Sequence, residues 1–199
     1  QGLYRTEQAV TVLADQEVTM PSPECVSLKK LRIAVYVGGN DDIASVLQDL
    51  GADDITRFYD FPARPLLFDA TVLAGFDALF IGCGVDILLP SNAAVLKDFV
   101  AAGGTLYVSD HASPYLEQAW PNVIDFVGDD LVPEAAQQGI TDEVDAIVNP
   151  PLLAALQSDT ARLEFAAGWS VMLSTTADVW VEADVTYRDG NANVQGRVP

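Results

Sequence analysis

A polar corner between a predicted strand and a predicted helix carries the residues best suited to chemistry. The stretch GGTLYVSDHASPYLEQAW (103–120) is typical of a turn, a strand, a sharp corner and a helix. The corner holds Asp110 and His111, and His111 is the only histidine in the chain. A carboxylate beside an imidazole can serve nucleophilic or general acid–base catalysis. The alternative is that Asp110 caps the helix and His111 is a partly buried, hydrogen-bonded residue.

A second corner, GCG (82–84), offers a thiol at the end of another predicted strand. If the two strands are neighbours, Cys83 lies near His111. With Asp110 or Asp86 nearby, these groups would make a cysteine-nucleophile set. The alternative is that Cys83 is a small buried residue at a tight turn.

The corners belong to a regular alternation of strands and helices that begins at Leu31. Continuous apolar runs predict strands buried on both faces, and apolar residues at helical spacing predict the helices between them. The predicted strands are 31–37, 54–61, 77–84 and 105–110, and the predicted helices are 42–52, 91–104 and 113–120. This alternation predicts an α/β fold with an open, mostly parallel, doubly wound sheet, flavodoxin-like and three-layered.

Parallel strands place their carboxyl ends at one edge of the sheet, where such folds bind ligands. We expect ligand contacts from the small residues of three corners: Gly38, Gly39, Gly82, Gly84 and Ser109. The first corner, GGNDD (38–42), lacks both the G-x-G-x-x-G pattern and the lysine of a phosphate loop. We predict that Asn40 or Asp41 caps the following helix.

The segments DALFIGCG (77–84) and LKDFVAAGGTLYVSDHAS (96–113) resemble the central part of the class I glutamine amidotransferase-like superfamily, which includes the DJ-1/PfpI and ThuA-like proteins. The resemblance covers roughly 31–120. It implies a glycine-rich corner that helps form an oxyanion hole. It also implies a nucleophile, often cysteine followed by histidine or glycine, at a tight strand-to-helix turn.

The chain departs from that superfamily at the catalytic positions. The nucleophile position falls on Asp110, and a carboxylate is a poor nucleophile toward amides. The superfamily's triad also uses a histidine late in the chain, and no histidine follows His111. The glutamine amidotransferase triad therefore cannot be assembled from this chain. We expect a relic of an active site, degenerate at the nucleophile position.

The charge restricts the partners. The net charge is −19, with 29 acidic and 10 basic residues. A surface this negative repels nucleic acid and anionic membranes. Few lysines among many carboxylates suit an extracellular, periplasmic or cell-envelope location, although solubility alone also explains them. A secreted protein would pair Cys25 with Cys83, whereas a cytosolic one would keep both reduced.

We expect no cofactor and no metal site, because one histidine and two separated cysteines do not make a zinc cluster. The acidic stretches 128–130 and 141–145 lack the spacing of a calcium loop, so we predict solvated acidic faces, with calcium binding as the alternative. Five aromatic residues form either a sugar-stacking platform or part of the core. They are Trp120, Phe165, Trp169, Trp180 and Tyr187.

The chain divides into an extended N-terminal arm, 1–30, and a domain, 31–199, predicted to lack its last strand or strands. After Trp120 we expect a short helix near 151–157 and β structure over 161–173 and 177–187. We expect a final strand that barely begins in 188–199.

Three functions compete at this point. The first is a non-catalytic, exported, amidotransferase-like domain that acts in binding or assembly, with a protein partner, self-association or a carbohydrate ligand. The second is a hydrolase that uses a strand-end pocket with Cys83 or Asp110 as nucleophile and His111 as acid–base. The third is a structural or filament-forming subunit, because exposed strand edges favour exchange between subunits.

Overall fold

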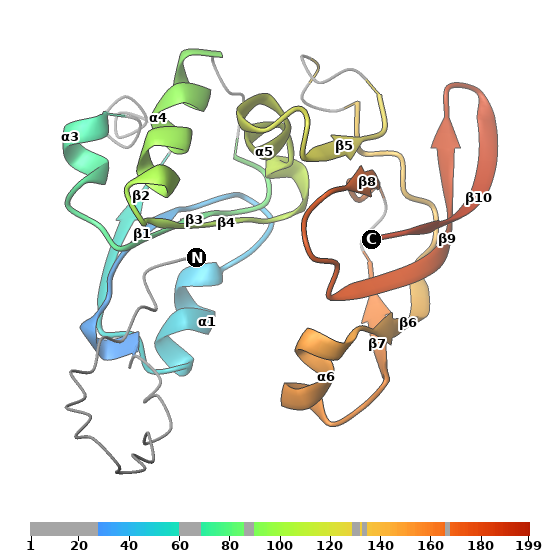
Figure 1. Ribbon diagram of the computed structural model, residues 1–199, viewed down its shortest axis with the longest axis horizontal. Helices are drawn as coiled ribbons and strands as arrows, with labels where there is room; N and C mark the ends of the chain where they lie inside the picture. The colour runs from blue at the N-terminus through green and yellow to red at the C-terminus, as the bar shows by residue number, and fades with distance from the viewer. Residues whose placement is uncertain (1–27, 60–68, 86–89, 129–131, 133–134, 166–167) are drawn as a thin grey trace, which may run out of the picture.

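The fold joins a parallel sheet to a group of antiparallel strands (Figure 1). The computed structural model describes residues 28–59, 69–85, 90–128, 132, 135–165 and 168–199. It begins with a short 3-10 helix, η1 (Leu28–Lys30). The rest of the predicted arm lies outside the described residues. Within the described residues, no helix is long and apolar enough to cross a membrane.

Four strands form the parallel sheet, and they follow the predicted alternation. They are β1 (Arg32–Tyr36), β2 (Asp54–Phe58), β3 (Ala78–Ile81) and β4 (Thr105–Val108). Their order is β2-β1-β3-β4, and every neighbouring pair is parallel. The prediction of an α/β fold with a parallel sheet in this part of the chain is confirmed.

Helices cover both faces of this sheet. One face carries α1 (Ile43–Asp49), and the opposite face carries α3 (Ala70–Leu73), α4 (Pro90–Ala101) and α5 (Pro114–Ala119) (Figure 1).

The strand sequences explain this covering, because successive side chains of a strand point to opposite faces. Ile33 and Val35 of β1 pack in the cluster that includes α1. Ala34 and Tyr36 pack in the cluster that includes the other three helices. All four residues are at most 1% exposed, so β1 after Arg32 is one continuous apolar run. Burial of each large side chain contributes about 1.5–3 kcal/mol.

The C-terminal part is built from antiparallel strands, as its β-type patterning predicts. The strands are β5 (Ile124–Phe126), β6 (Glu143–Val148), β7 (Thr160–Glu164), β8 (Met172–Thr175), β9 (Val181–Asp189) and β10 (Ala192–Val198). One sheet has the order β10-β9-β6-β7, and β5 and β8 form a separate pair. The helix α6 (Pro150–Leu156) lies where the short helix was expected.

Two local predictions are wrong. The final strand, expected to barely begin, is fully formed, because β10 pairs along its whole length with β9. The hairpin turn between them contains Gly190 at a φ of +59°, which glycine adopts readily. The helix α4 begins at Pro90, so neither Ser91 nor Asn92 is its cap. The prediction that the acidic stretch 141–145 is solvated is confirmed, because Asp142, Glu143 and Asp145 are all exposed, the last two at the start of β6.

Candidate functional site

The three predicted corners meet at one edge of the parallel sheet. The backbone N–H of Asn40 donates to the carbonyl of Cys83 at 3.1 Å, which ties the loop after β1 to the loop after β3. A Cβ atom added to Gly38 would lie 1.9 Å from the carbonyl oxygen of Cys83. Only glycine therefore allows the two backbones to approach so closely.

The helix cap in the first corner differs from the predicted one. Asp42 is the N-cap residue of α1, and its carboxylate accepts the N–H of Ser45. Asp41 instead turns toward the second corner, where its Oδ2 accepts the N–H of Cys83 at 2.8 Å. In this loop Asp42 therefore caps the helix, and Asp41, the residue before it, holds the corner that contains Cys83.

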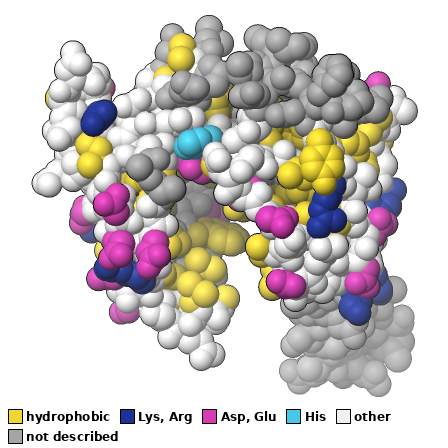
Figure 2. All heavy atoms as spheres, turned by 180° about the vertical axis from the view of Figure 1, so that it is seen from behind, with side chains coloured by type: hydrophobic (Ala, Val, Ile, Leu, Met, Phe, Trp, Pro, Cys, Tyr) yellow, Lys and Arg dark blue, Asp and Glu magenta, His cyan; other side chains and the backbone are white. Residues whose placement is uncertain are grey.

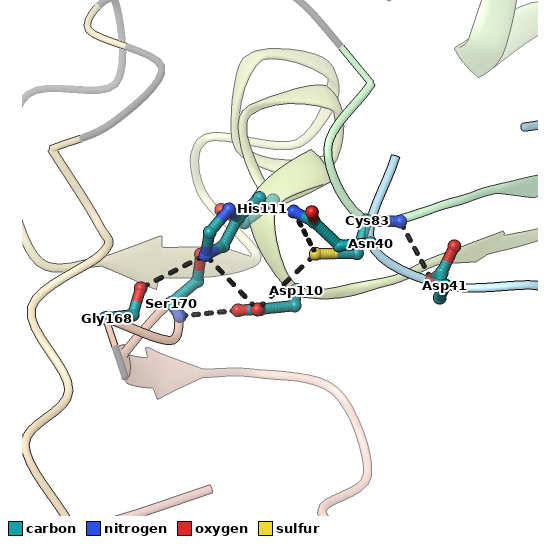
Figure 3. A network of polar contacts seen from close by, with 8 residues as sticks. Asn40, Asp41, Cys83, Asp110, His111, Gly168 and Ser170 are labelled. Atoms are coloured by element: carbon teal, nitrogen blue, oxygen red, sulfur yellow. Dashed lines mark hydrogen bonds and ion pairs between the residues drawn. The ribbon is translucent and has the colours of Figure 1, made fainter. Parts of the chain in front are cut away.

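The Cys83 thiol is buried between polar groups of all three corners (Figure 3). The residue is 7% exposed and its thiol is free. Its Sγ lies 3.6 Å from Nδ2 of Asn40 and 3.6 Å from Oδ2 of Asp110. Burial, with a smaller effect from the nearby carboxylates of Asp110 and Asp41, raises the pKa of this thiol. A protonated thiol is a weak nucleophile. Cys25 lies outside the described residues, so the disulfide stays a prediction.

Asp110 occupies a strained strand-to-helix elbow. Its φ is +34°, and it begins the 3-10 helix η2 (Asp110–Ala112) that leads into α5. The expected capping role is wrong, because neither of the two short helices at this corner has a side-chain cap. The Asp110 carboxylate reaches instead to the antiparallel part, where Oδ1 accepts the N–H of Ser170 at 2.6 Å.

His111 lies beside that carboxylate and also contacts the C-terminal part. Its Nε2 is 3.4 Å from Oδ2 of Asp110 and 3.1 Å from the carbonyl oxygen of Gly168. Because a carbonyl only accepts, this contact favours the tautomer that carries a proton on Nε2. The side chain is 23% exposed, and Figure 2 shows the single histidine at the surface next to an acidic side chain.

A cavity of about 280 Å³ opens beside the elbow, between α5 and the antiparallel strands. Its polar lining residues are Asp110, Ser113, Ser170 and Glu182. Apolar side chains make most of the remaining wall, among them Leu116, Leu163, Phe165, Trp169, Met172 and Val185. The hydroxyl of Ser113 lies 3.2 Å from that of Ser170, so one hydroxyl from each part of the fold meets at this wall.

The predicted aromatic residues do not share one surface. Phe165 and Trp169 stack on each other with ring centroids 4.5 Å apart. A Cβ atom on Gly139 would lie 2.1 Å from the Trp169 ring, so that indole is closely packed. Trp120 packs against the core of the parallel sheet, whereas Trp180 is 55% exposed.

The structure brings together Cys83, Asp110 and His111 and separates some of the other predicted residues. Gly82 and Gly84 serve the close packing of the corners, where a Cβ would clash with the side chains of Asp41 and Asn40. Gly39 has open space around it. Ser109 lines a different depression, beside Phe80 and Tyr107. Asp86 lies outside the described residues.

Sequence reasoning missed Gly168 and Ser170, which complete the polar network from the antiparallel part. They lie 57 and 60 residues after their partners, and neither stands in a motif.

Comparison with protein-family models, with curated proteins and with solved structures gives no match for this chain.

Proposed function

We propose that this chain is an amidotransferase-like domain that binds a small molecule in the cavity beside Asp110 instead of hydrolysing an amide. The observation that carries the proposal is the carboxylate of Asp110 at the elbow, on the wall of a mostly apolar cavity. A carboxylate offers acceptors only, so a bound group there must donate hydrogen bonds or carry positive charge. We infer a ligand with an apolar body and an amine or hydroxyl end.

Two features support the superfamily assignment and the three-layer flavodoxin-like form. The strand order β2-β1-β3-β4 agrees with the first four strands of the flavodoxin-like order, and helices pack on both faces. The positive φ of Asp110 suits the tight turn that presents a nucleophile in the superfamily. The residue at that turn is an aspartate, and the nearest thiol is buried.

The negative charge and the few lysines support the further proposal that the domain acts outside the cytoplasm. They also favour a positively charged partner, because like charges repel at long range. An amine ligand satisfies this condition.

Matched ligands test the proposal directly. Isothermal titration with 2-phenylethylamine, 2-phenylethanol and 3-phenylpropionate compares three end groups on a similar apolar body. We expect the amine to bind best, the alcohol more weakly and the acid not at all. In Asp110→Asn the preference of the amine over the alcohol falls about tenfold, as for a lost charged hydrogen bond. Equal binding of all three, or stronger binding of glucose or maltose, would overturn the amine assignment.

One observation favours the hydrolase as a second candidate. A non-glycine residue at positive φ stores strain, and such residues cluster at functional sites. Asp110 as nucleophile with His111 as acid–base suits glycosides or phosphates better than amides. A panel of ester, amide, glycoside and phosphate substrates tests this with wild type and Asp110→Asn. Turnover that disappears in the folded variant would establish hydrolysis and refute the binding-only proposal.

A further inference from the structure

We propose that Cys83, Asp110 and His111 form a zinc-binding site with three protein ligands. The proposal goes beyond the binding of an organic ligand and does not depend on it. The three side chains offer a sulfur, an oxygen and a nitrogen, and one ligand atom from each lies within 4.8 Å of the other two. These are the atom types that Zn²⁺ binds in proteins.

The distances between the ligand atoms fit a zinc ion. Zinc bonds of about 2.3 Å to sulfur and about 2.0–2.2 Å to oxygen or nitrogen place tetrahedral ligand atoms roughly 3.3–3.6 Å apart. Here Oδ2 of Asp110 lies 3.6 Å from Sγ of Cys83 and 3.4 Å from Nε2 of His111 (Figure 3). Two of the three distances between ligand atoms therefore already match those of a tetrahedral zinc site.

Neighbouring groups hold the ligands in this arrangement. The Ser170 N–H occupies Oδ1 of Asp110, so Oδ2 is the oxygen that faces the sulfur and the nitrogen. Nδ2 of Asn40 contacts the sulfur at 3.6 Å. Such outer contacts orient metal ligands and tune their affinity.

The backbone conformation of Asp110 accompanies this arrangement. Its φ is +34°, and it is the first residue of η2, a helix with no side-chain cap. A strained conformation of this kind persists where the surroundings impose it. Here it brings the carboxylate to the thiol and the imidazole.

Zinc binding changes the protonation of two of the three ligands. The Cys83 thiol loses one proton to solvent and binds as thiolate. The imidazole shifts its proton from Nε2 to Nδ1 through solvent, gives up the contact with the Gly168 carbonyl and binds through Nε2. Thiolate and carboxylate together balance the charge of Zn²⁺. The fourth position stays open for water or for a ligand group, as in zinc sites with three protein ligands.

The expectation of no metal site rested on the small number of histidines and cysteines in the chain. A site with three protein ligands needs only one histidine and one cysteine, placed by different strand ends. Cys83 and Asp110 are 27 residues apart, so their spacing resembles no metal motif.

The test uses the full chain under reducing conditions that do not chelate metal, with excess Mg²⁺ present to occupy surface carboxylates. Zn²⁺ is titrated by calorimetry, and Co²⁺ is added separately as a spectroscopic probe. We expect one Zn²⁺ per chain and a thiolate-to-cobalt charge-transfer band in the near ultraviolet. Cys83→Ser and His111→Gln should each weaken Zn²⁺ binding by more than the roughly 100-fold that loss of an outer contact costs. Asn40→Ala should weaken it about 10–100-fold.

Matched controls separate this site from the other groups of an acidic chain. Cys25→Ser removes the only other cysteine and should leave the affinity unchanged, as should Glu143→Gln on β6. Circular dichroism establishes that each variant is folded. Equal affinity in wild type and Cys83→Ser would overturn the proposal. So would a charge-transfer band that disappears in Cys25→Ser, or no zinc binding in the presence of Mg²⁺. None of these results depends on the amine titrations.

Discussion

The carboxylate of Asp110 accepts the backbone N–H of Ser170 at 2.6 Å and so joins the parallel sheet to the antiparallel part. Ser170 precedes β8, and Asp110 follows β4. The same carboxylate lies between the thiol of Cys83 and the imidazole of His111. One side chain thus holds the two parts together and forms the centre of the candidate site.

We expect substitutions of Asp110 to act on stability in graded fashion. Asn keeps an oxygen for the Ser170 N–H and tolerates positive φ, so Asp110→Asn should cost about 1 kcal/mol or less. Ala leaves that part-buried N–H without its acceptor, so Asp110→Ala should cost about 1–3 kcal/mol. Urea unfolding measures both values. Equal stability of Asp110→Ala and wild type would show that the contact does not join the two parts.

The close approach of the first two corners predicts that replacing Gly38 destabilises the fold much more than replacing the adjacent Gly39. Gly38→Ala places a methyl group against the backbone of Cys83, where a Cβ would lie 1.9 Å from the carbonyl oxygen. We expect it to lower the free energy of unfolding by about 1–3 kcal/mol or more. Gly39→Ala has nothing within 4 Å and should change it by about 0.5 kcal/mol or less. Similar effects of the two variants in urea unfolding would refute the close approach.

The parallel sheet was predictable because its signals are local. Residues 33–37 form a continuous apolar run, and a strand buried on both faces needs that pattern. The glycines and prolines between runs mark the turns. By contrast, β10 contains polar residues such as Asn193, Gln195 and Arg197, and its pairing with β9 depends on backbone hydrogen bonds that any residue but proline can make.

The candidate site was predictable only in part. Cys83 lies at the end of one predicted strand and His111 directly follows another, so the sheet topology alone brings them near each other. The role of Asp41 was not predictable, because its partner is the N–H of Cys83 across the fold instead of an N–H of the adjacent helix. Gly168 and Ser170 come from the antiparallel part, and nothing in the local sequence shows which loop of that part meets the elbow.

The ion pair between Arg32 and Asp77 predicts a pH-dependent contribution to stability. Hydrogen bonds from the Arg32 side chain and backbone lower the pKa of Asp77. A lowered pKa means that the contribution is present above the ordinary aspartate pKa of about 3.9. It is lost as the pH falls further, through the lower pKa of the folded protein.

Asp77→Asn should therefore be less stable than wild type at neutral pH, and the difference should shrink below about pH 4. Thermal unfolding across this range measures it. Arg32→Gln and the double variant complete a mutant cycle that isolates the pair. A difference that grows on acidification would contradict the lowered pKa.

The buried thiol of Cys83 predicts slow alkylation. Burial raises its pKa, so little thiolate forms at neutral pH and little of it is accessible. In chelator-treated Cys25→Ser, where Cys83 is the remaining cysteine, iodoacetamide should react far more slowly with the native protein than with the urea-unfolded protein. The native rate should still be rising at pH values where the unfolded rate has levelled off, above the ordinary cysteine pKa of about 8.5. Asp110→Asn should speed native alkylation, because the carboxylate opposes thiolate formation. Mass spectrometry follows the modification. Fast alkylation at neutral pH in the folded protein would identify Cys83 as an activated nucleophile and favour the hydrolase over the binding domain.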